Sequence, residues 1–491
     1  MRALSDRLGA CLALVLVLVS LWQLQGMRQG IAIEHLRVGQ TPVTRYAVLE
    51  SDGPVIVIAH GFAGSTQMMQ AYALTLARAD YRVYAFDFLG HGRNPVPMSG
   101  DVTVIDGTTR LLVDQTLEVV AAVADPGASV GMLGHSMATD VLIRAAQDRR
   151  ADIGPLVLLS AFSGAVTDRE PADMNLIAGQ WEGRLRAFGL EAVRMIDPAA
   201  AEGDLVRSGD VVRKAEFAPL TEHVSILHSR AAQQSTLAWF NRAFGRDGET
   251  DIPASGWWLL GLLAGIVALA RPLARVLPRS VGVTEQLSAR QIWAVAIGPA
   301  LAAPLLATWL NPNLLPVLVA DYLALHLFIQ GVLGLAVLWG MGVRPGAISA
   351  AGVLALLVWG LGAFGLALDR YGANFIPIPE RLWVIAALCI GTLPFMLADA
   401  LATRGGQAPI WQRWLLRICF FASLALAVTL DFEGLFFLIL IAPVMVLFYV
   451  VFGLMGRWVA LRCGPATSGV GLGLILAWAL GVSFPFLSAA G

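Results

Sequence analysis

Hydrophobic and polar positions divide the chain into two parts. One apolar run covers residues 8–24, a mixed region follows to about Asp251, and long apolar runs then continue towards residue 487. About 20 consecutive apolar residues are enough for a helix to cross a bilayer. The pattern predicts an N-terminal membrane anchor at 1–30, a water-soluble domain at 31–250 and a transmembrane domain of about eight helices at 251–491.

The expected spans after the anchor follow the apolar runs of the second part. They are 254–270, 292–310, 315–339, 348–368, 382–401, 415–430, 435–455 and 470–487. The anchor ends without a small-x-small cleavage site, so we expect it to be retained, with a cleaved signal peptide as the alternative.

Arginine positions predict the orientation in the membrane. With nine spans, the arginine-rich loops all fall on the side of Arg2 and Arg7. These loops hold Arg271, Arg275, Arg279, Arg290, Arg344, Arg404, Arg413, Arg457 and Arg462. The opposite loops carry Arg370 and Arg381, balanced by Asp369 and Glu380, and the acidic Asp431 and Glu433. By the positive-inside rule the N-terminus is cytoplasmic and the water-soluble domain exoplasmic. We expect a multi-pass protein of a bacterial-type cytoplasmic (inner) membrane, with this domain on the periplasmic side.

Composition narrows the possible functions. Hydrophobic residues make up 57% of the 491 residues and charged residues only 14%, which is too apolar for an ordinary soluble protein. The net charge of −1, without a basic stripe, argues against nucleic-acid binding. All four cysteines, Cys11, Cys389, Cys419 and Cys463, lie in or beside apolar runs, so the water-soluble domain has neither a disulfide nor a thiol nucleophile. Lipidation of Cys11 is not expected, because the apolar stretch follows it.

Strand-like and helix-like segments alternate in the water-soluble domain. Strands are expected at 54–59, 82–86, 129–133, 156–159, 174–178 and 211–218, and helices at 68–78, 108–123 and 138–149. Near-continuous Val, Ile and Leu in the strands indicates a parallel sheet covered by helices on both faces. The fold class is therefore α/β, followed by an all-α transmembrane domain.

A serine lies where one strand should turn sharply into a helix. The segment Gly134-His135-Ser136-Met137-Ala138 follows the expected strand 129–133 and opens the helix 138–149. Small residues at Gly134 and Ala138 suit a strained turn that exposes a nucleophile. By itself the string could arise by chance, and its context decides.

The region from about Ile31 to Gly248 resembles the α/β-hydrolase fold, most closely its monoglyceride-lipase-like and serine-aminopeptidase-like members. Three segments in the family's order carry the resemblance: His60-Gly61-Phe62-Ala63-Gly64-Ser65, Asp87-Phe88-Leu89-Gly90-His91-Gly92-Arg93-Asn94, and the serine turn. Ala138 stands where glycine is usual, and Asn94 replaces a common serine. The resemblance covers less than half of the chain.

The resemblance implies a Ser-acid-His triad with Ser136 as nucleophile. His60, His91 and His135 precede or adjoin the serine, so the family's order excludes them as the base. His223 is the favoured base, expected at the opening of a helix that runs towards Phe244, and His228 is the alternative. Near neutral pH an imidazole can both accept and return a proton.

Glu182, in Gly179-Gln180-Trp181-Glu182, is the favoured acid by the family's spacing, with Asp168 and Asp173 as alternatives. The backbone N–H groups of Phe62 and Met137 are the implied oxyanion donors. His60, Gly61, Asp87 and the flanking residues of the serine turn support these groups. Only about a dozen residues separate two strands where a cap domain is usually inserted, so we expect an open site with the membrane as its nearest surface.

Ionisable residues inside expected spans include Asp321, His326 and Asp399. Such groups often mark a polar pathway. The favoured interpretation places the two aspartates near the interface and gives His326 a helix neighbour as partner.

The sequence predicts a membrane-bound serine hydrolase that cleaves a carboxylic ester of a small-molecule or lipid acyl substrate. It needs no cofactor or metal, contacts membrane lipids and gives no sign of a protein partner. The alternatives are a transport or sensor protein whose hydrolase-like domain only binds, and an amide-cleaving peptidase that uses the same triad.

Overall fold

The computed structural model describes residues 2–100, 105–148, 152–279, 286–312, 314–317 and 319–487. Internal contacts divide the chain into two compact units. The helical unit comprises Met1–Leu18, Gly261–Leu368 and Phe375–Phe484, and the sheet unit comprises Val19–Leu260, Asp369–Asn374 and Pro485–Gly491. Two short segments from late in the chain thus belong to the sheet unit.

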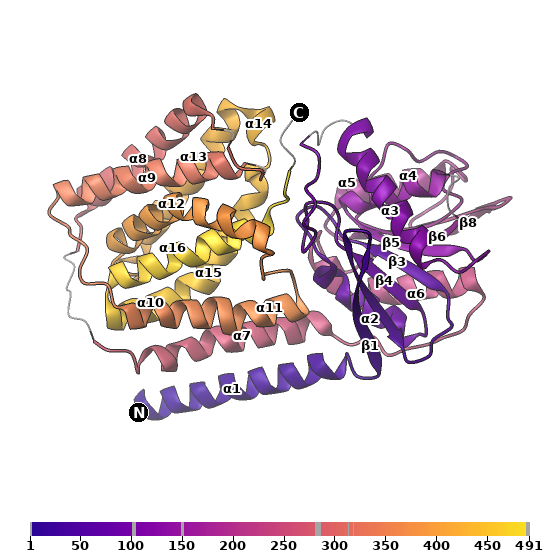
Figure 1. The fold of residues 1–491 in the computed structure, drawn as a ribbon, viewed down its shortest axis with the longest axis horizontal. Helices are drawn as coiled ribbons and strands as arrows, with labels where there is room; N and C mark the ends of the chain where they lie inside the picture. Colours follow the sequence, from indigo (N-terminus) through magenta and orange to yellow (C-terminus); the bar gives the residue numbers. More distant parts are fainter. Residues whose placement is uncertain are drawn as a thin grey trace. The chain divides into compact units, whose positions relative to one another are not determined.

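The sheet unit is built on nine strands in the order β1-β2-β4-β3-β5-β6-β7-β9-β8 (Figure 1). The strands are β1 (Ile31–Val38), β2 (Thr41–Val48), β3 (Val55–Ala59), β4 (Arg82–Phe86), β5 (Val130–His135), β6 (Ile153–Leu159), β7 (Asp173–Gly179), β8 (Leu205–Ser208) and β9 (Val211–Ala218). The six from β4 to β9 in this order are parallel, and every residue of β3 is buried, as expected for a strand covered on both faces.

Three antiparallel strands at the sheet margins were not predicted from the sequence. β1 and β2 form a hairpin against β4, and β8 pairs with β9. Half of β1 and most of β8 are exposed, so their sequences lack the continuous apolar run that identified the central strands. An edge strand has only one neighbour and one protected face, which leaves little hydrophobic signal.

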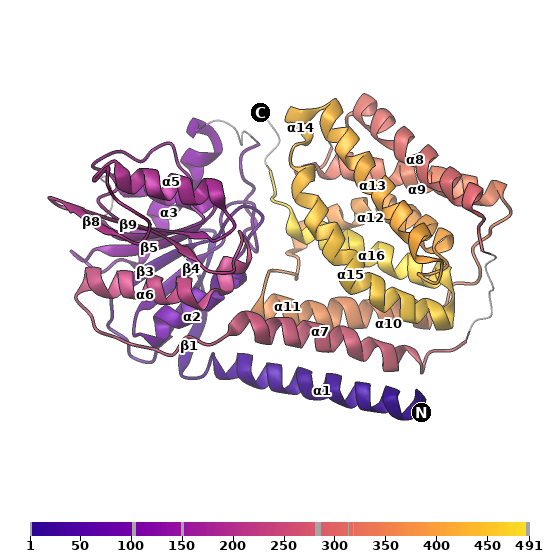
Figure 2. The same cartoon turned by 180° about the vertical axis from the view of Figure 1, so that it is seen from behind.

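Five helices cover the sheet. α2 (Gln70–Arg78) and α6 (Arg230–Phe244) lie on one face, and α3 (Arg110–Val123), α4 (Met137–Gln147) and α5 (Gly183–Arg194) lie on the other (Figures 1 and 2). The predicted helices correspond to α2, α3 and α4, although Arg149, the predicted end of the third, lies outside the described residues. The carboxyl ends of the parallel strands therefore form one rim between two helix layers.

The helical unit contains most of the apolar helices. Within the described residues, nine helices of the chain are long and apolar enough to cross a membrane. Eight of them are α1 (Arg2–Gly26), α7 (Ser255–Ala274), α8 (Ala289–Leu310), α9 (Ala320–Gly340), α12 (Pro379–Ala402), α13 (Ile410–Leu430), α15 (Leu438–Cys463) and α16 (Pro465–Ser483). The other is one continuous span of three segments: α10 (Ala350–Leu357), the π-helical Val358–Phe364 and α11 (Gly365–Tyr371). Multiple spans of this kind indicate a multi-pass membrane protein.

α1 and α7 run alongside each other at the edge of this unit (Figures 1 and 2). A Cβ at Gly265 would lie 2.7 Å from Val17 Cγ2, so glycine permits the close approach. Asp6 Oδ1 accepts from Arg271 at 3.1 Å, and its Oδ2 accepts from Arg275 at 2.7 Å. The start of α1 and the end of α7 therefore share one side.

Several helix boundaries differ from the sequence prediction. α15 continues to Cys463, eight residues past the predicted span, so Arg457 and Arg462 lie in this helix instead of in a loop. α13 begins at Ile410, five residues before the predicted span, so Arg413 is in its first turn instead of in a loop. α14 (Phe432–Leu435) is a separate short turn before α15. Polar residues at helix ends hide such boundaries from a hydropathy window.

Candidate active site

Ser136 occupies a strained turn between β5 and α4. Its φ of 55° and ψ of −120° are unusual for a residue with a side chain. A Cβ at Gly134 would lie 2.7 Å from Leu142 Cδ1 and 3.2 Å from the Cβ of Ala138. Ala138 is fully buried and is tolerated because position 134 has no side chain. The turn thus holds its hydroxyl at the rim of the sheet.

The structure brings together the three residues of the expected triad. His223 Nε2 lies 2.9 Å from Ser136 Oγ, and His223 Nδ1 lies 2.6 Å from Glu182 Oε1. A carboxylate can only accept, so Nδ1–H donates to Glu182 and Nε2 is left to accept the serine proton. This is the arrangement needed to remove a proton from a hydroxyl nucleophile.

Glu182 is held by two further donors. Ser160 Oγ and the backbone N–H of Gly179 each donate to Glu182 Oε2, both at 2.6 Å. Burial raises the pKa of this carboxyl, but the hydrogen bonds from His223, Ser160 and Gly179 outweigh burial, and its pKa lies below the ordinary value. The carboxylate is ionised at neutral pH. Ser160 was missed in the sequence, although its place after β6, beside the end of β7, is a signal for it.

His223 lies in a loop, so the predicted helix opening at this residue was wrong. A 3₁₀ turn covers Ser225–His228, and α6 begins only at Arg230. The Glu222 side chain accepts from the N–H groups of Val224 and Ser225 at 2.9 and 2.7 Å. These local bonds satisfy the backbone in place of a helix, a common use of an acidic side chain at a turn.

His135 forms a hydrogen bond to the loop that carries His223. Its Nε2–H donates to the carbonyl oxygen of His223 at 2.8 Å, and the two rings lie 4.9 Å apart. Burial, followed by the charge of His223, lowers the pKa of His135 to about 4. It therefore stays neutral near pH 7 and acts as a fixed donor.

The His60–Gly61 turn lies directly against the nucleophile. A Cβ at Gly61 would lie 3.0 Å from the Cβ of Ser136, so only glycine allows this approach. His60 Nδ1–H donates to the Gly61 carbonyl at 2.7 Å, and its Nε2 accepts from the Phe88 N–H at 3.1 Å. Burial lowers the pKa of His60, which is consistent with a neutral, structural imidazole. Met137 is the first residue of α4, where N–H groups have no intrahelical acceptor.

Asp87 organises the loops behind this turn. Its Oδ1 accepts from the Thr66 N–H at 2.8 Å, and its Oδ2 accepts from the Arg93 N–H at 2.9 Å. Asn94 donates through Nδ2 to the Asp87 carbonyl at 3.0 Å and accepts from the Val96 N–H at 3.0 Å. Asn94 thereby uses both ends of its amide to close the turn.

The alternative residues lie elsewhere. Asp173, at the first position of β7, pairs with Arg242 at 2.6 Å. It is six residues before Gly179, so it lies about 20 Å along the strand from the acid's turn. Asp168 acts electrostatically on buried Arg213, and His228 Nδ1 lies 3.2 Å from Ser255 Oγ.

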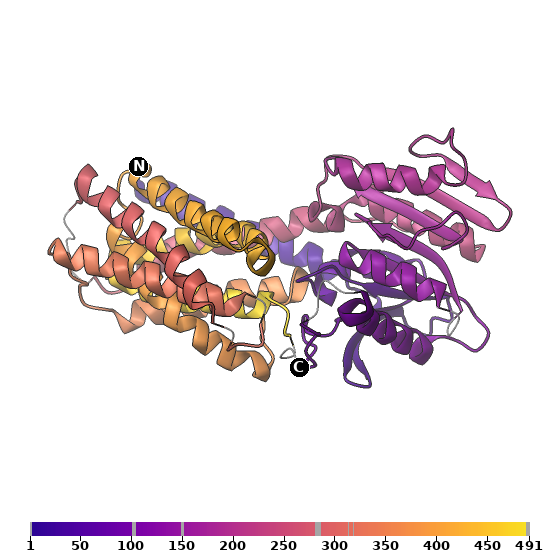
Figure 3. The same cartoon turned by 90° about the horizontal axis from the view of Figure 1, so that it is seen from above.

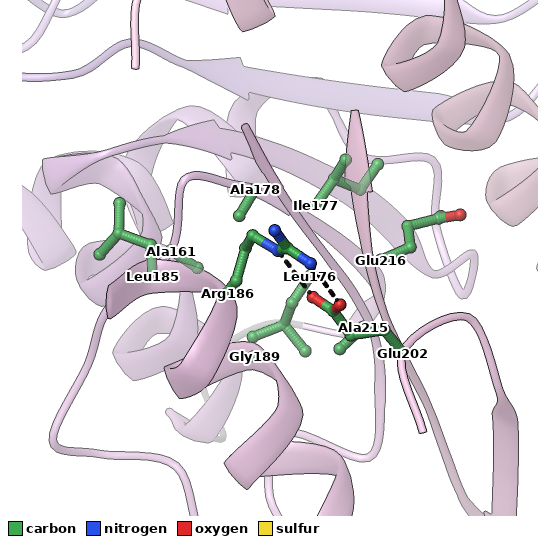
Figure 4. A pocket seen from close by; sticks show the side chains of 10 residues that line it. All are labelled: Ala161, Leu176, Ile177, Ala178, Leu185, Arg186, Gly189, Glu202, Ala215 and Glu216. Atoms are coloured by element: carbon green, nitrogen blue, oxygen red, sulfur yellow. Dashed lines mark hydrogen bonds and ion pairs between the residues drawn. The ribbon is translucent and has the colours of Figure 1, made fainter. Parts of the chain in front are cut away.

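Arg186 secures the turn that carries the acid. Its Nη1 donates to the Gln180 carbonyl at 3.0 Å. Its Nε and Nη2 donate to Glu202 at 2.9 and 2.6 Å, as Figure 4 shows. Its guanidinium also lies 4.3 Å from the centre of the Phe217 ring. This contact set ties α5, the acid's turn and β9 together.

The part of the chain that matches known proteins lies in the sheet unit. Residues 51–223 match the family model described as serine aminopeptidase, S33. This model ends at the candidate base and includes the serine turn and Glu182. The sheet unit thus has an α/β-hydrolase-like fold, and we call it the hydrolase domain.

A monoglyceride lipase homolog of monkeypox virus is 27% identical over 180 residues, covering 36% of this chain and 60% of that protein. The chain thus spans less than two thirds of the relative's length. Among solved structures, a CIB-like hydrolase from Thermoplasma acidophilum is 15% identical with a TM-score of 0.34, covering 43% of this chain and 98% of that one. A dienelactone hydrolase from Anabaena variabilis is 15% identical with a TM-score of 0.33, covering 43% and 97%.

The hydrolase domain exposes large apolar side chains around the candidate triad. Trp181 precedes Glu182 and is 64% exposed, while Leu220 and Val224 flank His223 and are 75% and 55% exposed. Phe162, whose N–H donates to Thr139 beside Ser136, is 52% exposed. Residues 160–172 form no helix, and all of them are described. The rim around Ser136 is therefore apolar, without a helical insertion at this position.

Two late segments complete the hydrolase domain. The Asn374 N–H donates to Ser65 Oγ at 3.0 Å, and the Arg370 carbonyl accepts from Gln70 at 3.0 Å. Asp369 pairs with Arg93 at 2.5 Å, so it balances this arginine and not only its neighbour Arg370. These contacts reach the segments of the His60–Gly61 and Asp87 loops. They were invisible in the sequence because they join residues about 300 positions apart.

The second segment adds a short parallel bridge. The Phe486 carbonyl accepts from the Met98 N–H at 2.8 Å, and the Phe486 N–H donates to Gly90 at 2.8 Å. A Cβ at Gly90 would lie 2.3 Å from that carbonyl, so glycine is required there. The 90–98 loop thus depends on a strand-like partner from the far end of the chain.

The polar residues of the membrane spans have local partners. Asp321 Oδ2 accepts from the Leu315 N–H at 2.7 Å near the start of α9. His326 contacts the hydroxyl of Tyr322, four residues earlier, at 3.3 Å and that of Ser423 at 3.1 Å. Asp399 forms an ion pair with Arg417. Arg417 is a further charged residue inside a predicted span, in addition to the three ionisable residues named from the sequence.

Proposed function

We propose that the protein is a membrane-bound serine hydrolase that cleaves carboxylic esters with an apolar acyl group. The single observation that carries the proposal is the continuous chain from Glu182 through His223 to Ser136, with contacts of 2.6 and 2.9 Å. A nucleophile, a base and an orienting acid within hydrogen-bond reach are the groups that acyl transfer requires.

In the proposed reaction, Ser136 Oγ attacks the acyl carbonyl carbon as its proton passes to His223 Nε2. Glu182 stabilises the resulting imidazolium. The N–H groups of Phe62 and Met137 are assigned to the oxyanion, since they flank the nucleophile on the two adjoining turns. The alcohol leaves with the proton from His223. Water then attacks the acyl-serine with His223 as base, which releases the acid.

The apolar rim supports a lipid or lipid-like substrate. Trp181, Leu220 and Val224 expose their side chains beside the residues that would react. Burying such surface against an acyl chain is favourable by about 25 cal/mol per Å². The viral relative is named for monoglyceride lipase, an activity on an ester.

We further propose the division into an anchor at 1–30, a hydrolase domain at 31–250 and a transmembrane domain at 251–491. The N-terminus would lie in the cytoplasm of a bacterial-type inner membrane, with the hydrolase domain on the periplasmic side. The shared side of Asp6, Arg271 and Arg275 supports the alternation on which this orientation rests.

A fluorophosphonate probe tests the reaction. The wild-type protein should be labelled covalently, and Ser136→Ala should not. Turnover of p-nitrophenyl acyl esters, with the matching anilides in parallel, separates ester from amide cleavage. Absent labelling of the folded wild type would favour the binding-only alternative, and faster anilide turnover would favour a peptidase.

A membrane-impermeant maleimide tests the orientation. In a chain whose four cysteines are replaced, Glu249→Cys should react from outside intact spheroplasts, while Arg279→Cys should react only after lysis. The reverse pattern would place the hydrolase domain in the cytoplasm.

A further inference from the structure

One groove in the helical unit combines charge and apolar surface. Its volume is about 440 Å³, and it lies between one face of α13 and one face of α15. The α13 face consists of Ile410, Arg413, Trp414, Arg417 and Phe421, and the α15 face of Val446, Tyr449, Val450, Gly453, Leu454 and Arg457. The spacings of three and four residues put each set on one side of its helix.

The charge of the groove is concentrated at one end. Arg413 is near the start of α13 and Arg457 near the end of α15, so both mark the same end of these antiparallel helices. Farther along, Phe421, Val446 and Val450 provide an apolar lining. Gly453 leaves space, because a Cβ there would meet nothing nearer than Tyr449 at 4.0 Å.

Two of the three arginines that line the groove have no ion-pair partner among the described residues. Arg417 is paired with Asp399 from α12. Within the part of the chain that the structure describes, no carboxylate forms an ion pair with Arg413 or Arg457. The buried Nε of Arg413 and the buried hydroxyl of Tyr449 also have no hydrogen-bond partner there. The groove thus presents two unbalanced positive charges and two unsatisfied donors, a combination that is costly without an acceptor.

We propose that this groove binds a membrane phospholipid with an anionic headgroup. The phosphate would lie between Arg413 and Arg457, whose positive charges complement its negative charge and whose planar guanidinium groups can donate paired hydrogen bonds to its oxygens. An acyl chain would follow Phe421, Val446 and Val450. Trp414 lies beside the charged end, the position that an indole favours at a membrane interface. A free phosphate has the same charge but leaves the apolar length of the groove unfilled.

This inference concerns the helical unit and does not depend on the proposed hydrolysis. The test uses the full-length protein in mixed micelles with dioleoyl phosphatidylglycerol or dioleoyl phosphatidylcholine. Native mass spectrometry measures how much of each lipid remains bound. We expect retention of phosphatidylglycerol well above phosphatidylcholine.

Two variants locate the binding. Arg413→Gln with Arg457→Gln should weaken phosphatidylglycerol retention on the order of tenfold, from the loss of two basic contacts near the headgroup. Gly453→Phe, which keeps every arginine, should also reduce it by blocking the acyl path. The matched control, Arg290→Gln with Arg344→Gln, removes the same charge elsewhere on the same predicted side and should leave retention unchanged.

Three results would overturn the proposal. They are equal retention of the two lipids, an equal loss in the control variant, or displacement of phosphatidylglycerol by millimolar inorganic phosphate. The last result would identify a phosphate site without a lipid requirement. Thermal unfolding of each variant in the same micelles shows whether the chain is folded, independently of lipid binding and of the proposed hydrolysis.

Discussion

One pair of an acidic and a basic side chain in each unit can be compared, and the two pairs differ in what they can do chemically. In the sheet unit Glu182 contacts the imidazole of His223, whose second ring nitrogen faces the Ser136 hydroxyl. In the helical unit Asp399 contacts the guanidinium of Arg417, which is always protonated. The first pair can move a proton, whereas the second can only cancel charge.

Their surroundings follow this difference. Glu182 has additional donors in Ser160 and Gly179, and His223 is 44% exposed, so the base can reach a substrate. Asp399 and Arg417 are 11% and 20% exposed, with Arg417 stacked 4.2 Å from the Tyr449 ring. A proton-transferring pair needs one open partner, and a structural pair is best enclosed.

The largest expected effect comes from the acid of the proposed triad. Glu182→Gln keeps the shape but removes the charge that stabilises imidazolium, so kcat should fall by about 10⁴-fold, as for comparable triads. Ester turnover by the purified protein measures it. Glu191→Gln, at an exposed position of the helix that follows Glu182, is the control. A loss below tenfold would mean that another residue supplies the acid.

Disrupting the Asp399–Arg417 pair should lower the stability of the protein. Asp399→Asn leaves Arg417 charged and uncompensated, which should destabilise the protein by about 3–5 kcal/mol. Thermal unfolding in detergent micelles measures this as a lower midpoint. Adding Arg417→Gln should restore much of the loss, since the double variant buries no lone charge. No recovery would mean that the pair matters for its geometry and not for its neutrality.

Buried histidine makes the sheet unit sensitive to acid. The folded pKa of His135 is about 4, against an ordinary value of 6.5. Between these values the unfolded chain binds the proton and the folded one does not, so stability is fully present above pH 6.5 and falls as the pH drops towards 4. The contribution at stake is about 3 kcal/mol.

His135→Gln tests this pH dependence. Its amide can still donate to the His223 carbonyl but does not titrate. The unfolding midpoint of the variant should depend less on pH between 6.5 and 4 than that of the wild type. Parallel curves would assign the acid sensitivity to His60 or His228, whose pKa values burial also lowers.

The smallest expected effect concerns Ser160. Ser160→Ala removes one of the donors to Glu182, worth about 1–1.5 kcal/mol, so kcat should fall about tenfold. The acidic limb of the pH–rate profile should also shift to higher pH, because loss of this donor raises the pKa of Glu182. Ser163→Ala, which removes a hydrogen bond to Asp140 instead, should change neither quantity. An unchanged profile in Ser160→Ala would make Ser160 a packing residue only.

The sequence was informative where a residue's role is local. The turn at Ser136 and the central strands were predictable because their apolar runs and small residues act over a few positions. The hairpin of β1 and β2 was not, since half of β1 is exposed and polar residues interrupt the apolar positions of β2. His223 was placed in the correct region but in the wrong element, because side-chain bonds from Glu222 replaced helical ones.

Other features depend on contacts that no local pattern reports. Asp399 and Arg417 lie 18 positions apart on different helices, and Asn374 reaches Ser65 from 309 positions away. Such pairs are set by how helices pack and by where loops return. Only the three-dimensional structure could connect them.

The bridge between Met98 and the 486–487 segment sets an order of events during biosynthesis. Residues 90–98 are made early, yet their backbone partner at Phe486 leaves the ribosome only after every helix from α7 to α16. The 90–98 loop therefore reaches its final hydrogen bonding late, after the membrane helices have been synthesised. Chain order thus links completion of the hydrolase domain to synthesis of the membrane helices.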